Sequence, residues 1–453
     1  MMRRKKGSVT VVLALMMMTF LMFCLVLTEG VRVYYVRAHG MQAMELAQFS
    51  VLSEFQKELF EQYGLFFLDL DYEQGTESIQ ILEQRVRNYL DKNTKELVTN
   101  HVLAEKFRRA TDGQGTAFFM QAVKDQKRGG VNGILEHLME SVKSAEIETA
   151  DLEAIIKEQE QKAKRALERL QSDEEETDSS WKIDLPKISF PSIDVLTEAV
   201  FGSTEMLSEK SIRLNERIRQ RELNTGDGTR INPSAGEMQL FHKYILKNCY
   251  YYGARDPGKW KDSLEYQVEY IISGKDSDYE NLEAIMWKIF LSRAVGNYLF
   301  YPNDAEKVAK ARAEAFAMVG IFGDGVLIES VKELCLISMA IEDGIWQTKQ
   351  IFAGEKVPLY QKGIFSGIFL GYEEYLLLFL NTVNKTQKIY RCMDVIELET
   401  RIRSGYENFR LDHCVDAFEL QWEYRFSSLF AGLPLSDGGI YENQIIRKVY
   451  YKY

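Results

Sequence analysis

The sequence predicts an α+β protein in which an N-terminal transmembrane helix continues as a long amphipathic helix packed on an antiparallel sheet with additional helices. Three observations predict this fold. Residues 9–27 form an uncharged apolar stretch, helical periodicity follows it, and apolar and polar residues alternate near the C-terminus. Because a helix and a sheet each bury one face, these elements need to be layered on one another.

The apolar stretch 9–27 predicts a membrane span. About nineteen helical residues rise roughly 28 Å, close to the hydrocarbon thickness of a bilayer. The stretch runs into Thr28 and Glu29 without a small-residue cleavage pattern, so we expect an uncleaved anchor in the cell membrane. Four cations occupy positions 3–6, and the positive-inside rule therefore predicts that residues 1–8 are cytoplasmic and that the rest of the chain faces outward.

The composition indicates a packed, acidic outer domain. Hydrophobic residues make up 46% of the chain and aromatic residues 12%, which is typical of a globular body. The net charge is −11, and leaving out the four leading cations makes it −15. An acidic surface of this size disfavours nucleic acid as a partner.

The helix of the span is expected to continue outside the membrane. From Ala38 to Tyr63 apolar residues recur at steps of three and four without a proline, which predicts one helix to about Gln62. Gly64 is the expected stop signal, and the apolar run 65–68 reads as a buried strand that ends in a turn.

The next part of the chain predicts helices, a strand and a linker. We expect a helix over 76–92, a strand in the first half of 96–107, a break at 111–115 and a protruding helix within 131–170. Acidic and proline residues over 173–194 predict a linker. The expected domain organisation is therefore a first α+β part over 28–172, this linker, and a helical region with C-terminal strands over 195–453.

The remaining elements alternate between helix and strand patterns. Strict alternation predicts a strand over 264–272, and alternation over 418–426 with a partner at 440–453 predicts a terminal hairpin. The expected sheet combines 65–70, 263–272, 416–430 and 440–452, with helices on one face. Helices are expected at 194–222, 234–252, 279–300, 303–319, 324–345 and twice within 371–403.

The sequence contains no motif for catalysis, a cofactor or a metal ion. Its five histidines are isolated, and C-x-x-C, G-x-x-x-x-G-K-[ST] and G-x-S-x-G motifs are absent. The nearest approach to a calcium loop is Asp69-x-Asp71-x-Glu73, whose glycine, Gly75, is one position late. An ordinary polar turn is the favoured interpretation, and we predict no catalytic, cofactor or metal site.

Two weaker patterns leave alternatives open. Carboxylate pairs such as Glu373 with Glu374, or Glu265 with Glu269, could perform acid–base chemistry, although a solvated face is the favoured interpretation. The aromatic alternation through Trp422 could form a ligand platform, although a sheet core is favoured.

Five cysteines are too few for a disulfide-dense scaffold. A single bridge between Cys392 and Cys414 is one interpretation, and burial as small apolar side chains is the favoured one.

The N-terminal region resembles the TadE/TadG-like proteins of tight-adherence (Tad/Flp) pilus systems. The similarity rests on RRKKGSVTVVLALMMMTF, on the long helix that follows, and on the helix-to-strand passage EQYGLF at 61–66. LEYQVEYIISGKDSDYENL and YEEYLLLFLNTVNKTQKIYRCMDVIELETR also look similar to a branch with large outer domains. The resemblance implies a pilin-like fold and a processing point between Gly7 and Ser8. The fifth residue after that point is Val12, where pilins often carry glutamate.

These observations lead to one functional hypothesis and two alternatives. The leading hypothesis is a non-enzymatic, single-pass surface protein, a pilin-like accessory subunit or assembly factor. Its partners would be membrane or pilus subunits bound through the N-terminal helix and proteins bound by the outer domain. One alternative is a membrane-anchored binding module, an adhesin or ligand receptor, that uses the aromatic C-terminal strands. The other is an extracellular hydrolase with a carboxylate pair.

Overall fold

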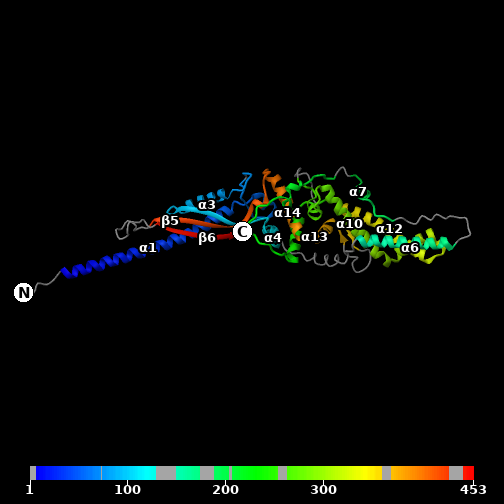
Figure 1. The fold of residues 1–453 in the computed structure, drawn as a ribbon, viewed down its shortest axis with the longest axis horizontal. Helices are drawn as coiled ribbons and strands as arrows, with labels where there is room; N and C mark the ends of the chain where they lie inside the picture. Colours follow the sequence, from blue (N-terminus) through cyan, green and yellow to red (C-terminus); the bar gives the residue numbers. More distant parts are fainter. Residues whose placement is uncertain are drawn as a thin grey trace, which may run out of the picture. The chain divides into compact units, whose positions relative to one another are not determined.

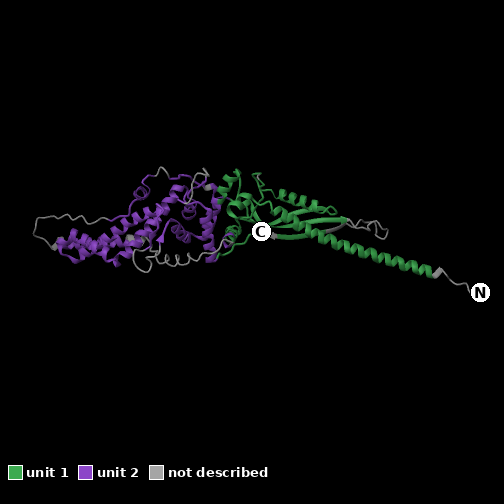
Figure 2. Ribbon diagram, turned by 180° about the vertical axis from the view of Figure 1, so that it is seen from behind, with its two compact units in different colours: residues 1–124, 222–233, 396–453 green, residues 125–221, 234–395 purple. Residues whose placement is uncertain are grey.

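A computed structural model of the chain describes residues 7–72, 74–128, 149–173, 188–203, 207–253, 263–359, 369–427 and 442–452. These residues form two compact units (Figure 2). Unit 1 comprises residues 1–124, 222–233 and 396–453, and unit 2 comprises 125–221 and 234–395. The fold is α+β, as predicted, and the sheet of unit 1 is assembled from both ends of the sequence.

The sheet of unit 1 is antiparallel and centred on β5 (Cys414–Ser427). Along one side β5 pairs with β2 (Val98–Arg109), and it also pairs with β6 (Glu442–Lys452) and the short β1 (Leu68–Asp69). The predicted terminal hairpin pairing and the predicted strand within 96–107 are thus confirmed. The predicted strand at 65–68 is reduced to β1, which is two residues long.

Alternation along β5 decides which face of the sheet is buried. Trp422 and Tyr424 are both 0% exposed and pack with the helices, whereas Glu419 and Glu423 lie on the other, partly exposed face. The helices α1 (Gly7–Leu52) and α3 (Ile79–Asn93) contribute to the same apolar core as the sheet. Figure 1 shows the second half of α1 beside β5 and β6 and its first half extending beyond them.

The N-terminal helix is shorter than predicted. It ends at Leu52 rather than near Gln62, and after a short break α2 (Lys57–Tyr63) follows. Gln56 adopts an extended backbone and its side chain accepts a hydrogen bond from the Lys57 amide, so this polar residue begins a new helix. Gly64 ends α2 with φ +67°, as expected of a stop signal.

Within unit 1, one carboxylate binds two amides of the loop 222–233. Asp112 begins α4 (Asp112–Arg128), and its side chain accepts hydrogen bonds from the amides of Arg109, Gly226 and Gly228. A Cβ atom at Gly226 would lie 2.2 Å from the Phe107 carbonyl oxygen, so only glycine permits this close approach.

Unit 2 is helical. Its long helices α10 (Asp278–Phe300), α11 (Ala305–Val319) and α12 (Gly325–Phe352) correspond to the three predicted ones, and Asp324 caps α12 as expected. α6 (Thr149–Asp173), α11 and α12 share a core cluster. The other elements are α7 (Ile193–Phe201), α8 (Ala235–Asn248), α9 (Gln267–Ser273), α13 (Tyr372–Thr382), most of α14 (Lys385–Ser404), and the short strands β3 (Val357–Pro358) and β4 (Phe369–Leu370).

The prediction of a strand at 264–272 is wrong, because most of this segment lies in α9. Its polar residues are not on a solvated face: Gln267 and Glu269 are buried and accept hydrogen bonds from the amides of Tyr250 and Tyr252. The helix predicted over 194–222 ends at Phe201, and only short 3₁₀ turns follow it. The predicted linker 173–194 falls within unit 2, and residues 174–187 lie outside the described ranges.

Candidate functional site

The first half of α1 has the properties of a membrane span. Within the described ranges it belongs to the one helix that is long and apolar enough to cross a bilayer, and none of its most apolar window is buried. Side chains such as Leu13 (63%) and Phe20 (62%) are exposed over most of their surface. A helix this apolar cannot remain bare in water, so lipid or other apolar helices must cover it.

Aromatic residues follow the predicted span. Tyr34 and Tyr35 are 76% and 56% exposed, and Tyr35 stacks on His39 with ring centroids 5.6 Å apart. Tyrosine is enriched where a membrane helix meets water because its ring is apolar and its hydroxyl is polar. This position fits the outer boundary of a span that ends near residue 27.

The second half of α1 buries one apolar face and exposes some apolar side chains on another face. One face, which includes Met44 and Val51, is fully buried in the core of unit 1. The other face carries Met41, Leu46 and Phe49, which are 49%, 55% and 65% exposed. We call these three residues the outer stripe. The exposed residues Gln42 and Glu45 lie on the same face, so the outer stripe is a set of apolar side chains on a mixed surface.

The helix is tightly seated on the sheet. A Cβ atom at Gly40 would lie 2.6 Å from the Tyr424 hydroxyl, so the absence of a side chain lets the helix and the strand approach closely. Eight residues further on, the Gln48 side-chain amide donates to the carbonyl of Val449 in β6 at 3.2 Å. α1 is therefore a structural part of unit 1 rather than a flexible tether.

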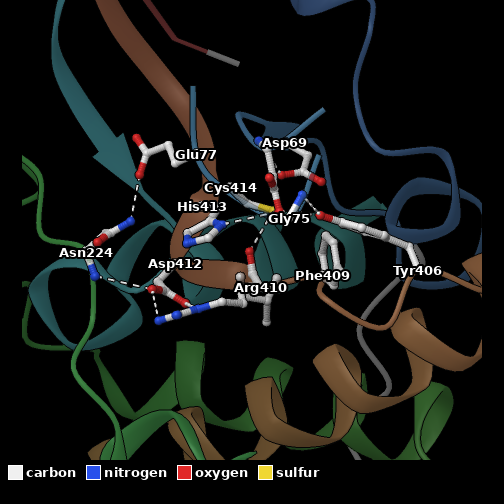
Figure 3. Close-up of polar contacts among 12 residues, drawn as sticks. Asp69, Gly75, Glu77, Asn224, Tyr406, Phe409, Arg410, Asp412, His413 and Cys414 are labelled. Atoms are coloured by element: carbon white, nitrogen blue, oxygen red, sulfur yellow. Dashed lines mark hydrogen bonds and ion pairs between the residues drawn. The ribbon is translucent and has the colours of Figure 1, made fainter. Parts of the chain in front are cut away.

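A polar cluster in unit 1 lies where β5 begins (Figure 3). Asp412 is fully buried and accepts two hydrogen bonds from Arg410, at 3.1 and 2.7 Å, and one from the Asn224 amide at 3.2 Å. The Asn224 side chain in turn donates to Glu77 at 2.6 Å. This cluster fixes the loop 222–233 to the chain segment that precedes β5.

Arg109 completes this cluster and borders a surface pocket. Its guanidinium binds Glu77 in a bidentate manner, at 2.7 and 3.0 Å, and donates to the Asp412 carbonyl at 2.8 Å. The pocket has a volume of about 770 Å³ and includes Asn224 and the first turn of α3. The two charges in its wall pair with each other, and the pocket offers mainly polar contacts.

A second group surrounds the buried Asp71 and includes Gly75, Tyr406 and His413, which are labelled in Figure 3. The Tyr406 hydroxyl donates to Asp71 and accepts from the Gly75 amide, and His413 Nδ1 lies 3.7 Å from Asp71 Oδ2. Burial and the nearby Asp71 carboxylate raise the pKa of Tyr406. Asp69 accepts from the Asp71 amide at 3.0 Å, so the acidic residues of the near-calcium motif hold a turn.

The described residues bring no three metal-binding side chains together. Glu73, the third acidic position of that motif, lies outside the described ranges.

The carboxylate pairs considered from sequence have separate structural tasks. Glu265 pairs with Lys210 at 2.9 Å, whereas Glu269 is buried and accepts from the Tyr372 hydroxyl at 2.6 Å. Burial raises the pKa of Glu269 to about 7. Glu374 accepts from the Gly371 amide at 2.9 Å and caps α13. None of these arrangements is an acid–base pair in a cleft.

Unit 2 also contains a buried basic pair that the sequence did not indicate. Lys388 on α14 and His242 on α8 are 2% and 1% exposed, and their side-chain nitrogens are in contact. Desolvation lowers the pKa of Lys388 to about 7 and also lowers that of His242. Lysine on a helix normally predicts an exposed position, so residue type alone gave no signal for this pair.

The remaining predicted site residues have simple locations. Gly7 and Ser8 form the start of α1. Cys392 and Cys414 are both buried free thiols that belong to different units. The bridge between them stays a prediction.

Residues 185–364 and 365–426 match a family of unknown function, DUF5702. No curated protein and no solved structure matches the chain. The matched ranges span elements of both units, from the segment before α7 to Phe426 in β5. Because they cover more than half of the sequence, the chain belongs to this family of unknown function, DUF5702.

Proposed function

We propose that the chain is a non-enzymatic, single-pass membrane protein that acts as a pilin-like accessory subunit or assembly factor of a Tad/Flp-type pilus or a related secretion system. The observation that carries the proposal is α1. It is one 46-residue helix that contains the apolar span, then buries one face in unit 1 and exposes the outer stripe on another. An anchor that only tethered a domain would need neither feature.

The proposed partner is another membrane-anchored subunit whose helix runs alongside α1. Such a helix would contact the span inside the bilayer, where van der Waals packing drives association. Outside the bilayer it would cover Met41, Leu46 and Phe49. The cations at positions 3–6 support an orientation with the N-terminus in the cytoplasm and both units outside. The similarity of the N-terminus to TadE/TadG-like proteins favours the pilus context.

The binding-module alternative has less support. It requires a platform of exposed aromatic residues on the C-terminal strands. Trp422 and Tyr424 are fully buried, and Tyr450 on β6 is 53% exposed. The hydrolase alternative requires two carboxylates in a pocket. The pocket beside α3 contains Glu77, whose charge is paired with Arg109.

Site-specific photo-crosslinking in intact cells tests the proposal. A photoreactive residue replaces Phe49 in the outer stripe and, as a matched control, Lys448 on the open face of the sheet. We expect crosslinks from position 49 to a membrane-anchored pilus or secretion subunit and none to it from position 448. Mass spectrometry of the same sample reads the N-terminal peptide and reports whether the chain is cut between Gly7 and Ser8.

Three results would contradict the proposal. These are crosslinks from position 49 to lipid or envelope polymer alone, identical products from both positions, and protease protection that places the two units in the cytoplasm.

A further inference from the structure

A groove runs along one face of the predicted span. It has a volume of about 480 Å³ and is lined by Leu13, Met16, Met17, Thr19, Phe20 and Phe23. Where two helices interlock, four residues at positions i, i+3, i+4 and i+7 of one helix surround a side chain of the other. The lining residues contain this spacing twice, at positions 13, 16, 17 and 20 and at positions 16, 19, 20 and 23. The groove therefore has the residue spacing of a seat for the side chains of a second helix.

Thr19 is the smallest residue of this groove. Its hydroxyl donates to the Met16 carbonyl at 2.9 Å, so it needs no polar partner inside a bilayer. Small residues let membrane helices approach closely, and van der Waals packing then drives their association. We therefore expect an apolar side chain of a neighbouring helix to lie beside Thr19.

The face that carries the groove continues outside the span. Phe20 and Glu45 belong to one unbroken helix and are about seven helical turns, or roughly 38 Å, apart along its axis. A whole number of turns makes their side chains point in the same direction. Glu45 is exposed, lies next to Leu46 and one turn from Met41 and Phe49, and forms no ion pair with another described residue. The groove and the outer stripe thus lie on one face of α1, with an unpaired carboxylate among the outer apolar side chains.

We propose that the partner of α1 is a different membrane-anchored helix, which places an apolar side chain beside Thr19 and a lysine or arginine side chain opposite Glu45. A carboxylate on a contact surface favours a partner of opposite charge. On the partner helix these two residues must be separated by about 38 Å, or about 25 helical residues. The proposal rests on the proposed function, because it specifies the chemistry of the partner named there.

Glu45 also argues against a second copy of this chain as the partner. In a two-fold symmetric pair the same surface of both copies forms the contact. Two parallel α1 helices joined through this face would therefore bring their Glu45 carboxylates close together. Like charges placed together in a contact oppose association.

Crosslinking of the full-length chain in intact cells tests the groove. The photoreactive residue at position 49 reports the yield of crosslinked partner, and variants of α1 are compared in this background. Thr19→Phe fills the groove and should lower the yield by about tenfold. Met18→Phe is the matched control, because Met18 is also exposed but lies on the opposite side of the span from Phe20. We expect the control to leave the yield unchanged.

The same reporter tests the charge of the partner. Glu45→Lys should lower the yield by about tenfold, whereas Glu61→Lys, at an exposed carboxylate of α2, should not. Mass spectrometry identifies the partner residue that is crosslinked to position 49, and we expect a lysine or arginine within about two helical turns of it. Replacement of that residue by glutamate should restore the yield of the Glu45→Lys variant.

The outcomes separate this proposal from the proposed function. A crosslinked membrane subunit whose yield is the same in Thr19→Phe, Glu45→Lys and the two controls would overturn the proposal and leave the proposed function standing. A partner without a lysine or arginine in that range, or a second copy of the chain as the main product, would also overturn it. The absence of any crosslinked membrane protein would overturn both.

Discussion

The partners of the buried ionisable groups differ between the two units. In unit 1 several buried charges occur as pairs of opposite sign, such as Arg109 with Glu77 and Arg410 with Asp412. In unit 2 several buried groups have neutral partners instead. Glu269 is held by a tyrosine hydroxyl and a backbone amide, and Lys388 by an imidazole.

This difference predicts different responses to pH. A buried pair of opposite charges remains ionised because each charge stabilises the other. A buried group without an opposite charge reaches its neutral form more easily, so its pKa moves towards neutrality. The stability of unit 2 should therefore depend on pH near neutrality. The stability that the buried pairs give unit 1 should change little in that range and should be lost when one partner is mutated.

The largest expected effect comes from breaking a charge pair in unit 1. Arg109→Met should leave Glu77 uncompensated and lower the free energy of unfolding by about 3–5 kcal/mol. Hydrogen exchange followed by peptide mass spectrometry should report the loss in unit 1. Lys57→Met is the control, because the Lys57–Glu61 pair is 3.6 Å long and largely exposed. Equal effects of the two substitutions would contradict this account of unit 1.

The next effect concerns Glu269 in unit 2. Its pKa in the folded state is about 7, above the ordinary 4.5, so the folded state binds the additional proton. This contribution to stability is fully present below pH 4.5 and is lost as the pH rises through about 7. The loss should reach about 3 kcal/mol. In Glu269→Gln this pH dependence should disappear, as measured by denaturant unfolding at pH 5 and pH 8.

Lys388 should produce the opposite dependence at higher pH. Its folded pKa is about 7, below the ordinary 10.5, so the unfolded state binds the proton between these values and stability rises with pH in that window. Lys388→Met removes the buried charge but also the contact with His242. We expect a net stabilisation of about 1–3 kcal/mol at pH 6. Lower stability than the natural chain at pH 6 would show that Lys388 has a charged partner.

The smallest effect on stability is expected at the outer stripe of unit 1. Phe49→Ser should change the free energy of unfolding by less than about 0.5 kcal/mol, because the side chain is mostly exposed. Met44→Ala, on the buried face of the same helix, should cost about 2–5 kcal/mol. Only Phe49→Ser should weaken the proposed helix–helix contact while leaving hydrogen exchange unchanged.

Two segments explain why part of the fold could be predicted from sequence. Residues 418–426 and 264–272 share the same alternation, yet the first forms β5 and the second contains α9. In β5 the polar residues face the open side of the sheet. In the second segment Gln267 and Glu269 are buried and bind backbone amides. Alternation indicates a strand only if its polar residues reach solvent, and the sequence alone does not reveal that.

The sequence predicted the parts of the candidate site that lie in one continuous stretch of the chain, and not the parts assembled from distant residues. The span and the helix that follows it lie in one continuous stretch, so composition and periodicity identified them. The polar cluster draws Glu77, Arg109, Asn224 and Asp412 from distant parts of the chain. No spacing rule brings such residues together.

The positions of the paired strands along the chain also determine when the sheet can form during synthesis. β2 and β5 are separated by roughly 300 residues, which take about 15–60 s to translate at 5–20 residues per second. Throughout this interval α1 has no β5 or β6 on which to bury Met44 and Val51. Unit 2 is synthesised entirely before unit 1 can close. A nascent chain of this protein therefore holds an open apolar surface along α1 until its last strands arrive.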